Sequence, residues 1–484
     1  MSFDSLPFLG FLAFVLVGYW LLPQRFRWVL LLLVSYVFCA SWAPKFVIPL
    51  ALSTLSAYLA ARLMGKTSEP KRRRFQLALG GLISVGLLHT FKYLGFAAET
   101  LRTIVGFVGL ADWVTVPNLL LPVGISFYSL QAIGYLIDVY RGKTEPEMHL
   151  GLFALYMAFF PRLISGPIER AEHLIPQFRQ TPTLDAPRLF SGLRLLLWGM
   201  FKKVVVADRL AVYVNEVYGQ PGDHAGWTVV IAMFFSAAHI FADFSGYSDM
   251  AVGVARLFDV DVIQNFQQPY LAASVSDFWR RWHISLSSWL RDYIYIPLGG
   301  NRVPPWRRSL NVLITFLVSG LWHGAAWTFV LWGLLHGVYI VLESLGKGAA
   351  DWVFKTLRLE RTGVRRATGT VATILMVSFA WILFYSRSVP DATLLIRNMA
   401  RLGSGTDVYA PWASLTGAAG VQMALAWALI GLLALVHLGR EDRLPQASLV
   451  VHRAGVRWAA YLCVALAILN LGVANQLPFL YAGF

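Results

Sequence analysis

Long stretches without a charged residue recur along the chain, separated by short clusters of charges. Nine of these stretches are 17 residues or longer. They cover residues 5–24, 28–44, 75–91, 113–137, 225–242, 309–342, 367–386, 408–439 and 458–484. A membrane-spanning helix needs roughly 20 mostly apolar residues, and segment 46–61 is nearly long enough. We therefore predict ten or eleven membrane-spanning helices.

The longest uncharged stretch, Ser309–Leu342, has enough residues for a hairpin of two short helices. Gly320 or Gly324 would form the hinge, because glycine adopts backbone conformations that other residues avoid. The apolar stretches are continuous rather than alternating, which argues against the strands of a membrane barrel. The pattern thus predicts an all-α, polytopic integral membrane protein.

The middle of the chain, residues 138–310, mixes charged with aromatic residues. Only 225–242 within it is uncharged for long enough to span a membrane. Charged groups at bilayer depth are costly and tend to line cavities or lie at the interface. We therefore expect interfacial or partly buried helices here, within a single membrane domain 1–484. Its parts would be N-terminal helices (1–118), a core (119–345) and C-terminal helices (346–484).

The composition narrows the function classes. Hydrophobic residues make up 57% of the chain and charged residues only 14%, whereas soluble proteins carry about 25% charged residues. This excludes a soluble enzyme and a disordered protein. The only cysteines, Cys39 and Cys463, lie in apolar stretches, which excludes a disulfide scaffold. The net charge of +15 is typical of basic cytoplasmic loops, and nucleic-acid binding is the weaker interpretation.

Clusters of Lys and Arg predict the orientation, because such clusters stay on the cytoplasmic side. The clusters are Arg62–Arg74, Lys347–Arg366 and Arg440–Arg457. All three agree with one topology, in which both chain termini face the outside. Segment 5–24 lacks the basic flank of a signal peptide, since its N-terminal flank carries only Asp4, so we interpret it as a retained first helix.

His323 lies in LVSGLWHGAAW, near the middle of the longest uncharged stretch. It is either a core histidine bonded to a backbone carbonyl or a general base. Imidazole suits the second role, because its unperturbed pKa lies nearest neutrality and apolar surroundings keep it unprotonated. The adjacent Gly324 would leave room for a substrate to approach.

His283 lies in DFWRRWHISLSSWLRD, whose pattern predicts one interfacial amphipathic helix that ends near Pro297–Gly300. One side carries Trp279, Trp282, Leu286 and Trp289, and another carries Arg281, Ser285 and Ser288. The imidazole is either an ordinary interfacial side chain or a second polar group that orients a substrate.

Other motifs add little catalytic potential. The histidines do not have zinc-ligand spacing, so we expect no metal site. His336 would lie on a different helix face from His323, and we interpret it as structural. Asp243 needs a partner if it is buried. The sequence has no GxSxG or GxxxxGK[ST] motif, so serine hydrolysis and nucleotide hydrolysis have little support.

Two long blocks carry a family resemblance: NFQQPYLAASVSDFWRRWHISLSSWLRDYIYIPLGGNR and LVSGLWHGAAWTFVLWGLLHG. They resemble the membrane-bound O-acyltransferase family, above all its bacterial branch that modifies alginate, with teichoic acid D-alanylation as a relative. FFPRLISGPIERAEHLIPQF and FADFSGYSDMAVGVARLF support the resemblance. It implies a ring of membrane helices around a funnel or tunnel, with re-entrant helices at its thin centre.

The resemblance also implies site residues. His323 in LWHG corresponds to the family's catalytic histidine, and His283 in RRWH corresponds to its second characteristic polar position. Around them we expect substrate-binding or tunnel residues, namely Trp279, Arg280, Trp282, Asn301, Trp322 and Tyr247. Basic residues that could attract the phosphates of a donor, or serve as interfacial anchors, are Arg280, Arg281, Arg302, Arg307 and Arg308.

The function implied is transfer of an acetyl group across a bacterial inner membrane. The donor implied is a cytoplasmic thioester, acetyl-CoA, with no bound cofactor. The acceptor would be an extracytoplasmic, alginate-like polysaccharide, reached directly or through a serine of a periplasmic partner protein; we favour the partner. Transfer of D-alanyl groups or of acyl groups to peptidoglycan is the alternative within the family. A transporter or flippase without chemistry is the alternative of another class.

Overall fold

The computed structural model of the protein describes residues 1–117, 119–357, 359, 363–403, 407–415, 417–441 and 454–473. These residues form helices joined by turns and loops, and no β-strand occurs among them. The predicted all-α fold class is thereby confirmed. The predicted external chain end and part of the basic cluster 440–457 lie outside the described residues.

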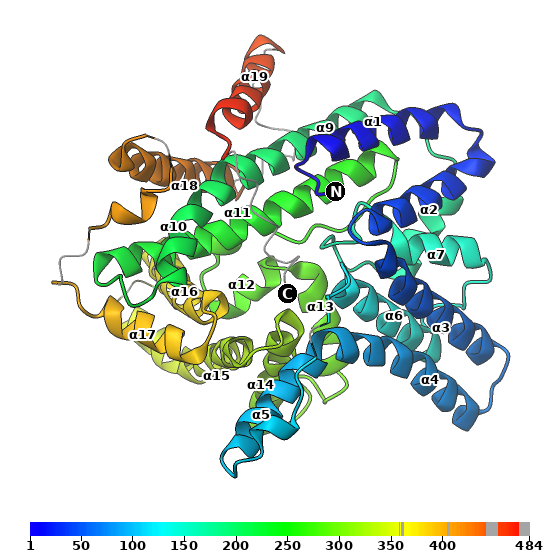
Figure 1. The fold of residues 1–484 in the computed structure, drawn as a ribbon, viewed down its shortest axis with the longest axis horizontal. Coiled ribbons are helices and arrows are strands. Elements are labelled where there is room, and N and C mark those ends of the chain that lie inside the picture. Colours follow the sequence, from blue (N-terminus) through cyan, green and yellow to red (C-terminus); the bar gives the residue numbers. More distant parts are fainter. Residues whose placement is uncertain are drawn as a thin grey trace. The chain divides into compact units, whose positions relative to one another are not determined.

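The chain separates into two compact units (Figure 1). The first holds residues 1–196 and 247–264, and the second holds residues 197–246 and 265–473. Helix α11 (Trp227–Leu257) contributes its first part to the second unit and its last turns to the first. The organisation of the chain as one domain with three parts stays a prediction.

The first unit consists mainly of helices joined by short connections. They are α1 (Leu6–Leu21), α2 (Gln24–Ala40), α3 (Val47–Gly65), α4 (Pro70–Leu88), α5 (Leu94–Gly106), α6 (Ile125–Tyr140), α7 (Leu150–Ala158), α8 (Ala171–Leu174) and most of α9 (Ala186–Met200). Single tight turns of helix are η1 (Pro44–Phe46), η3 (Ala111–Trp113) and η4 (Ile175–Arg179), and η2 (His89–Tyr93) is a π turn. Helices α3, α4 and α6 pack against one another, and α7 packs on α2 and α3.

Small residues allow α3 and α4 to approach closely. A Cβ atom at Gly80 would lie 2.6 Å from the Cβ of Ala60, so only glycine fits there. The hydroxyls of Ser53 and Ser84 lie 3.2 Å apart in the same interface and form a buried hydrogen bond. Small residues and interhelical hydrogen bonds of this kind are what holds helices together in lipid, where apolar burial adds little.

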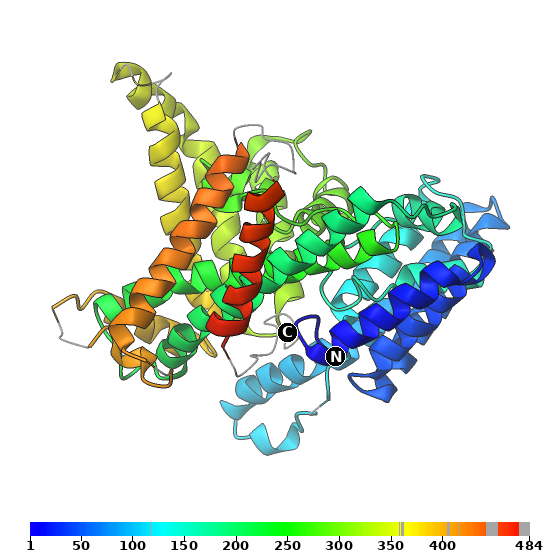
Figure 2. The same cartoon turned by 90° about the horizontal axis from the view of Figure 1, so that it is seen from above.

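The second unit contains the segments that carry His283 and His323. Its helices are α10 (Asp208–Gly219), the first part of α11, α12 (Val275–Arg281), α13 (Ile284–Leu290), α14 (Pro305–His323), α15 (Trp327–Thr356), α16 (Gly363–Tyr385), α17 (Val389–Met399), α18 (Ala419–Glu441) and α19 (Ala454–Leu471). Shorter turns are η5 (Phe201–Ala207), η6 (Pro269–Leu271), η7 (Arg291–Tyr295) and η8 (Ala410–Trp412). The long helices α15 and α16 pack side by side (Figure 2).

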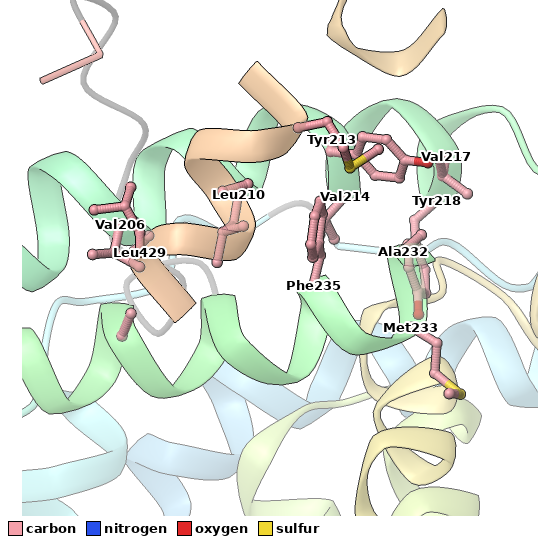
Figure 3. Close-up of a cluster of buried hydrophobic side chains, with 14 of the residues drawn as sticks. Val206, Leu210, Tyr213, Val214, Val217, Tyr218, Ala232, Met233, Phe235 and Leu429 are labelled. Atoms are coloured by element: carbon pink, nitrogen blue, oxygen red, sulfur yellow. The ribbon is translucent and has the colours of Figure 1, made fainter. Parts of the chain in front are cut away.

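An apolar core holds α10, α11 and α18 together. Tyr213 and Val214 of α10 face Phe235 of α11 in this cluster, and Leu429 comes from α18 (Figure 3). Asp243 of α11 is 1% exposed, and it has the partner that its burial requires, because Lys203 of η5 pairs with it at 2.9 Å. The lysine also pairs with Asp208 at 2.7 Å.

Helices α14 and α15 form the hairpin that the sequence predicts for 309–342, but the helices are not short: they have 19 and 30 residues, and α15 continues to Thr356. The turn between them comprises Gly324, Ala325 and Ala326, so the predicted hinge at Gly324 is confirmed. Behind the turn the two backbones touch. A Cβ at Gly320 would lie 2.3 Å from the Phe329 carbonyl oxygen, and one at Gly333 would lie 2.3 Å from the Phe316 carbonyl oxygen.

Within the described ranges, six helical segments are long and apolar enough to cross a membrane. They are Pro44–Gly65, Pro70–Gly106, Trp227–Leu257, Trp327–Thr356, Gly363–Tyr385 and Ala419–Gly439. Leu6–Leu21 and Gly455–Leu471 are shorter apolar helices. A multi-pass membrane protein is therefore confirmed. The predicted count is larger than six because some predicted spans form helices of only 16 or 17 residues, as α1, α2 and α6 do.

The hairpin contact predicts a large cost for adding one methyl group. Gly320→Ala should lower the stability of the purified protein by about 1–3 kcal/mol, because the new Cβ would overlap a backbone oxygen that cannot move away. Thermal unfolding in detergent measures the effect. Gly346→Ala in α15 is the matched control, since no atom lies within 4 Å of its Cβ position. Equal melting temperatures for the two variants would contradict the close contact.

Candidate functional site

His323 is the last residue of α14, and its side chain is 1% exposed. The backbone leaves the helix at Gly324, which is extended. Gly324 does not leave room for a substrate, contrary to the prediction, because a Cβ there would lie 2.1 Å from the ring of Phe329. This glycine instead lets the aromatic ring pack against the turn of the hairpin.

His283 lies at a break between two short helices, so the prediction of one continuous amphipathic helix is wrong. Helix α12 ends at Arg281, and α13 begins at Ile284. His283 itself has φ 43° and ψ 54°, in the left-handed region, which costs a residue other than glycine about 1–2 kcal/mol. Apolar spacing alone did not reveal the break, because Trp279, Trp282 and Leu286 also fit one helix face.

The break and the hairpin bring the two imidazoles together. Their ring centroids lie 6.3 Å apart, although 40 positions separate them in the chain. Trp322 contacts both, with its centroid 5.7 Å from His283 and 5.0 Å from His323. Two histidines and an indole from separate segments therefore form one cluster.

Three further aromatic side chains complete an aromatic box around this pair, which we define as Phe244, Trp322, Trp332 and Phe384. Phe244 of α11 lies 4.7 Å from His283, edge to face. Trp332 of α15 lies 4.9 Å from His323, and Phe384 of α16 lies 5.6 Å from it. These rings help to bury both imidazoles, which are 0% and 1% exposed.

Burial also determines the protonation of His283. Its side chain is fully buried, and loss of hydration lowers its pKa to about 3, because the imidazolium form is disfavoured away from water. The ring is therefore neutral at physiological pH. A neutral imidazole can donate one hydrogen bond and accept another, which suits the binding of a hydroxyl or carbonyl group.

The other predicted site residues fall into three places. Trp322 belongs to the aromatic box. Trp282 is fully buried as well, and its ring stacks on that of Phe278 at a centroid distance of 5.3 Å. Trp279 is separated from His323 by Trp332 and donates a hydrogen bond of 3.2 Å to His336. His336 thus holds α12 to α15, and it lies on the other arm of the hairpin from His323, not further along the same helix.

Tyr247 lies in the first unit, where it stacks on Phe3 at 4.6 Å. Arg280 and Asn301 line a pocket of the second unit whose lining includes neither His283 nor His323. Sequence reasoning did not single out Phe244, Trp332 and Phe384 as site residues. The first two lie inside the quoted family blocks, which was the one signal available.

This pocket has a volume of about 700 Å³ and lies among α12, α14, α15 and α16. Four cationic side chains line it: Arg280, Arg308, Lys347 and Arg365. One carboxylate, Glu343, also lines it and accepts a hydrogen bond of 3.1 Å from the Ser276 backbone N–H. The charged side chains that line the pocket are therefore mostly positive, which favours an anionic ligand.

Of the other basic residues predicted to attract a donor, Arg281 pairs with Asp277 at 3.1 Å. Arg302 and Arg307 are not among the residues that line the pocket. The described part of the chain shows no group of three or more His, Cys, Asp or Glu side chains that could hold a metal ion.

Comparison with known proteins gives related sequences over the whole chain. Residues 147–386 match the membrane-bound O-acyltransferase family. The protein named "Probable alginate O-acetylase AlgI" of Pseudomonas putida is 35% identical over 100% of both chains. The "Peptidoglycan O-acetyltransferase" of Helicobacter pylori is 32% identical over 83% of this chain and 78% of its own. The "Teichoic acid D-alanyltransferase" of Streptococcus thermophilus is 29% identical over 46% of this chain and 56% of its own.

The backbone conformation at position 283 predicts different effects for two small substitutions. His283→Gly should be more stable than His283→Ala by about 1 kcal/mol, because glycine adopts left-handed angles without strain. Both variants remove the same imidazole and differ by one methyl group, so each controls the other. Thermal unfolding of the two purified proteins measures the difference. A more stable alanine variant would show that position 283 is not left-handed.

Proposed function

Because the chain belongs to the membrane-bound O-acyltransferase family, we propose that it transfers an acetyl group from a thioester to a hydroxyl of an extracytoplasmic polysaccharide. The observation that carries the proposal is the pair of buried imidazoles, 6.3 Å apart, inside the aromatic box. A neutral imidazole in such surroundings can take a proton from a hydroxyl, which is the step that activates an acceptor.

The names of the relatives support the transferred group and the acceptor class. Two are named for O-acetylation, one of alginate and one of peptidoglycan, and both align with most of this chain. The relative named for D-alanyl transfer matches under half of it. We therefore favour acetyl as the group and an alginate-like polysaccharide as the acceptor, with peptidoglycan or D-alanyl transfer as the alternative.

In the proposed reaction His323 is the general base. It accepts the proton of the acceptor hydroxyl, and the oxygen attacks the carbonyl carbon of the thioester. His283 positions the acceptor or donates a hydrogen bond to the developing oxyanion, a type of stabilisation that often dominates acyl transfer. The carbon–sulfur bond then breaks, and the thiolate leaves with the proton that His323 holds. The products are an acetyl ester and a free thiol.

The cationic pocket is the proposed binding site for the phosphates of the donor, acetyl-CoA. Arg280, Arg308 and Lys347 offer charged donors there, and phosphate groups bind such side chains strongly. Trp279, next to Arg280 in α12, contacts Trp332 of the aromatic box. The pocket and the imidazole pair are thus supported by the same short helix. This favours a donor that binds by its phosphates at one place and reacts at another.

We propose that the donor binds on the cytoplasmic side of the inner membrane, a side that the predicted orientation of the basic clusters supports. We propose that donor and acceptor reach the imidazoles from opposite sides through a tunnel, as the family resemblance implies. The acetyl group passes to the polysaccharide directly or through a serine of a periplasmic partner. Detection of an acetylated serine on a co-purifying protein, in cells with active His323 only, would decide for the partner.

A transporter without chemistry has less support, because the chain belongs to a family of acyltransferases. Incubation of the purified protein, together with any partner protein that co-purifies with it, with acetyl-labelled acetyl-CoA and an acceptor glycan separates the two. An acyltransferase releases free CoA and labels the glycan, whereas a transporter does neither.

Removal of the proposed base tests the mechanism. His323→Ala should lower the rate of acetyl transfer by about 10²–10⁴-fold, the usual contribution of a general base, while the protein stays folded in the membrane. Acetylation of the polysaccharide, measured by mass spectrometry, gives the result. His224→Ala is the matched control, because His224 is also buried in the second unit but lies in the loop before α11. Normal acetylation by His323→Ala would refute the assignment.

Removal of pocket cations tests the donor site. Arg280→Ala and Lys347→Ala should each raise KM for acetyl-CoA about 10-fold, the worth of a charge-assisted hydrogen bond, with little change in kcat. With acetyl-pantetheine, which has no phosphates, the same variants should match the wild type. Arg72→Ala is the control, because Arg72 belongs to the first unit and does not line the pocket. Equal losses with both donors would contradict phosphate binding.

A further inference from the structure

The break between α12 and α13 is held by a segment from elsewhere in the sequence. The backbone N–H of Ile284 donates to the Asn265 carbonyl at 3.0 Å, and that of Ser285 donates to Asn265 Oδ1 at 3.2 Å. On the other side of the break, the Gln267 N–H donates to the Arg281 carbonyl at 2.9 Å. Residues 265–267 therefore clamp both ends of the break.

The two bonds that Asn265 accepts cap the N-terminus of α13. The first N–H groups of a helix have no partner within it, and the side chain of the residue before the helix usually accepts one of them. His283 occupies that position in α13, yet its side chain makes no such bond. Asn265 accepts the N–H groups of Ile284 and Ser285 in its place.

We infer that Asn265 is a positioning residue for His283 in the proposed acyl transfer. Because Asn265 caps α13 from a distance, the side chain at position 283 does not have to, and it can be an imidazole that turns toward Phe244, Trp322 and His323. The same bonds hold His283 in its left-handed conformation, which a non-glycine residue keeps only where its surroundings fix it. This inference rests on the proposed function.

The burial and hydrogen bonding of the Asn265 side chain are those expected of a residue that holds the break in place. Its side chain is 1% exposed, so water does not compete for Oδ1. Within the described residues Nδ2 makes no hydrogen bond. An aspartate at 265 would consequently keep every bond that the structure shows for this side chain, whereas an alanine would lose the bond to the Ser285 N–H.

Acetyl transfer to an acceptor glycan by the purified full-length protein, with any co-purifying partner present, tests the inference. Asn265→Ala should lower kcat by about 10- to 100-fold, the effect of a small misplacement of a reacting group, with KM for acetyl-CoA unchanged. Asn265→Asp should stay within about fivefold of the wild type, because a carboxyl group buried at this depth stays protonated and its carbonyl oxygen can still accept the Ser285 N–H. Asn265→Ser, whose side chain is too short, replaces the alanine variant if that protein is not recovered folded.

A second measurement separates positioning from a general loss of stability. In a His283→Ala background, Asn265→Ala should lower the remaining rate less than about twofold, since it acts through the imidazole that is already absent. Asn398→Ala is the matched control. Asn398 is 2% exposed in the same unit and donates to the carbonyls of Pro221 and His224, so its loss should affect melting temperature and not kcat.

Three outcomes would overturn the inference: a wild-type kcat in Asn265→Ala, an aspartate variant as slow as the alanine variant, or losses that multiply in the His283→Ala background. A different result would contradict the proposed function, namely a wild-type protein without acetyl transfer. In that case the wild-type protein itself neither releases CoA nor acetylates the glycan.

Discussion

The backbone contact between α14 and α15 is the constraint on which the site depends. Gly320 and Gly333 let the two helices touch, and Gly324 lets Phe329 pack against the turn. With the hairpin closed in this way, His323 at its tip is directed between Trp322 and Trp332. A side chain larger than hydrogen at these glycines would separate the helices and move the imidazole. The packing of small residues therefore controls the position of a polar one.

The second imidazole reaches the site by a different physical route. It lies on a residue in a left-handed conformation, which is unfavourable for histidine and is held by hydrogen bonds from residues 265–267. Strained residues of this kind cluster where function requires a definite geometry. In a continuous helix, each backbone N–H of this segment would bond to a carbonyl of the same helix. The direction of the side chain at position 283 would then be set by the helix geometry alone. The break gives the ring another direction at the cost of local strain.

In the second unit, the buried imidazole pair and the cluster of cationic side chains line different places. The imidazole pair lies among aromatic side chains, where an uncharged base is favoured. The cationic side chains gather in another pocket, lined by Arg280, Arg308 and Lys347. Cations next to the imidazoles would stabilise an alkoxide but would also disfavour a protonated histidine. In the proposed function, a donor with phosphates would bind in this pocket, whose lining does not include either imidazole.

The sequence by itself determined the features that depend on local pattern. Uncharged stretches predicted apolar helices, a 34-residue stretch predicted the hairpin and its hinge at Gly324, and two blocks indicated the family and both histidines. The tertiary structure decided what depends on residues distant in the chain. Helical periodicity continues through Trp282 and His283, so the break is visible only with Asn265, which lies 18 positions before the histidine and caps α13. Phe329 fills the space at Gly324, and Phe384 reaches His323 from α16. The physical reason is that periodicity reports which face of one helix is buried, whereas hydrogen bonds and ring contacts between segments determine where the chain departs from that helix.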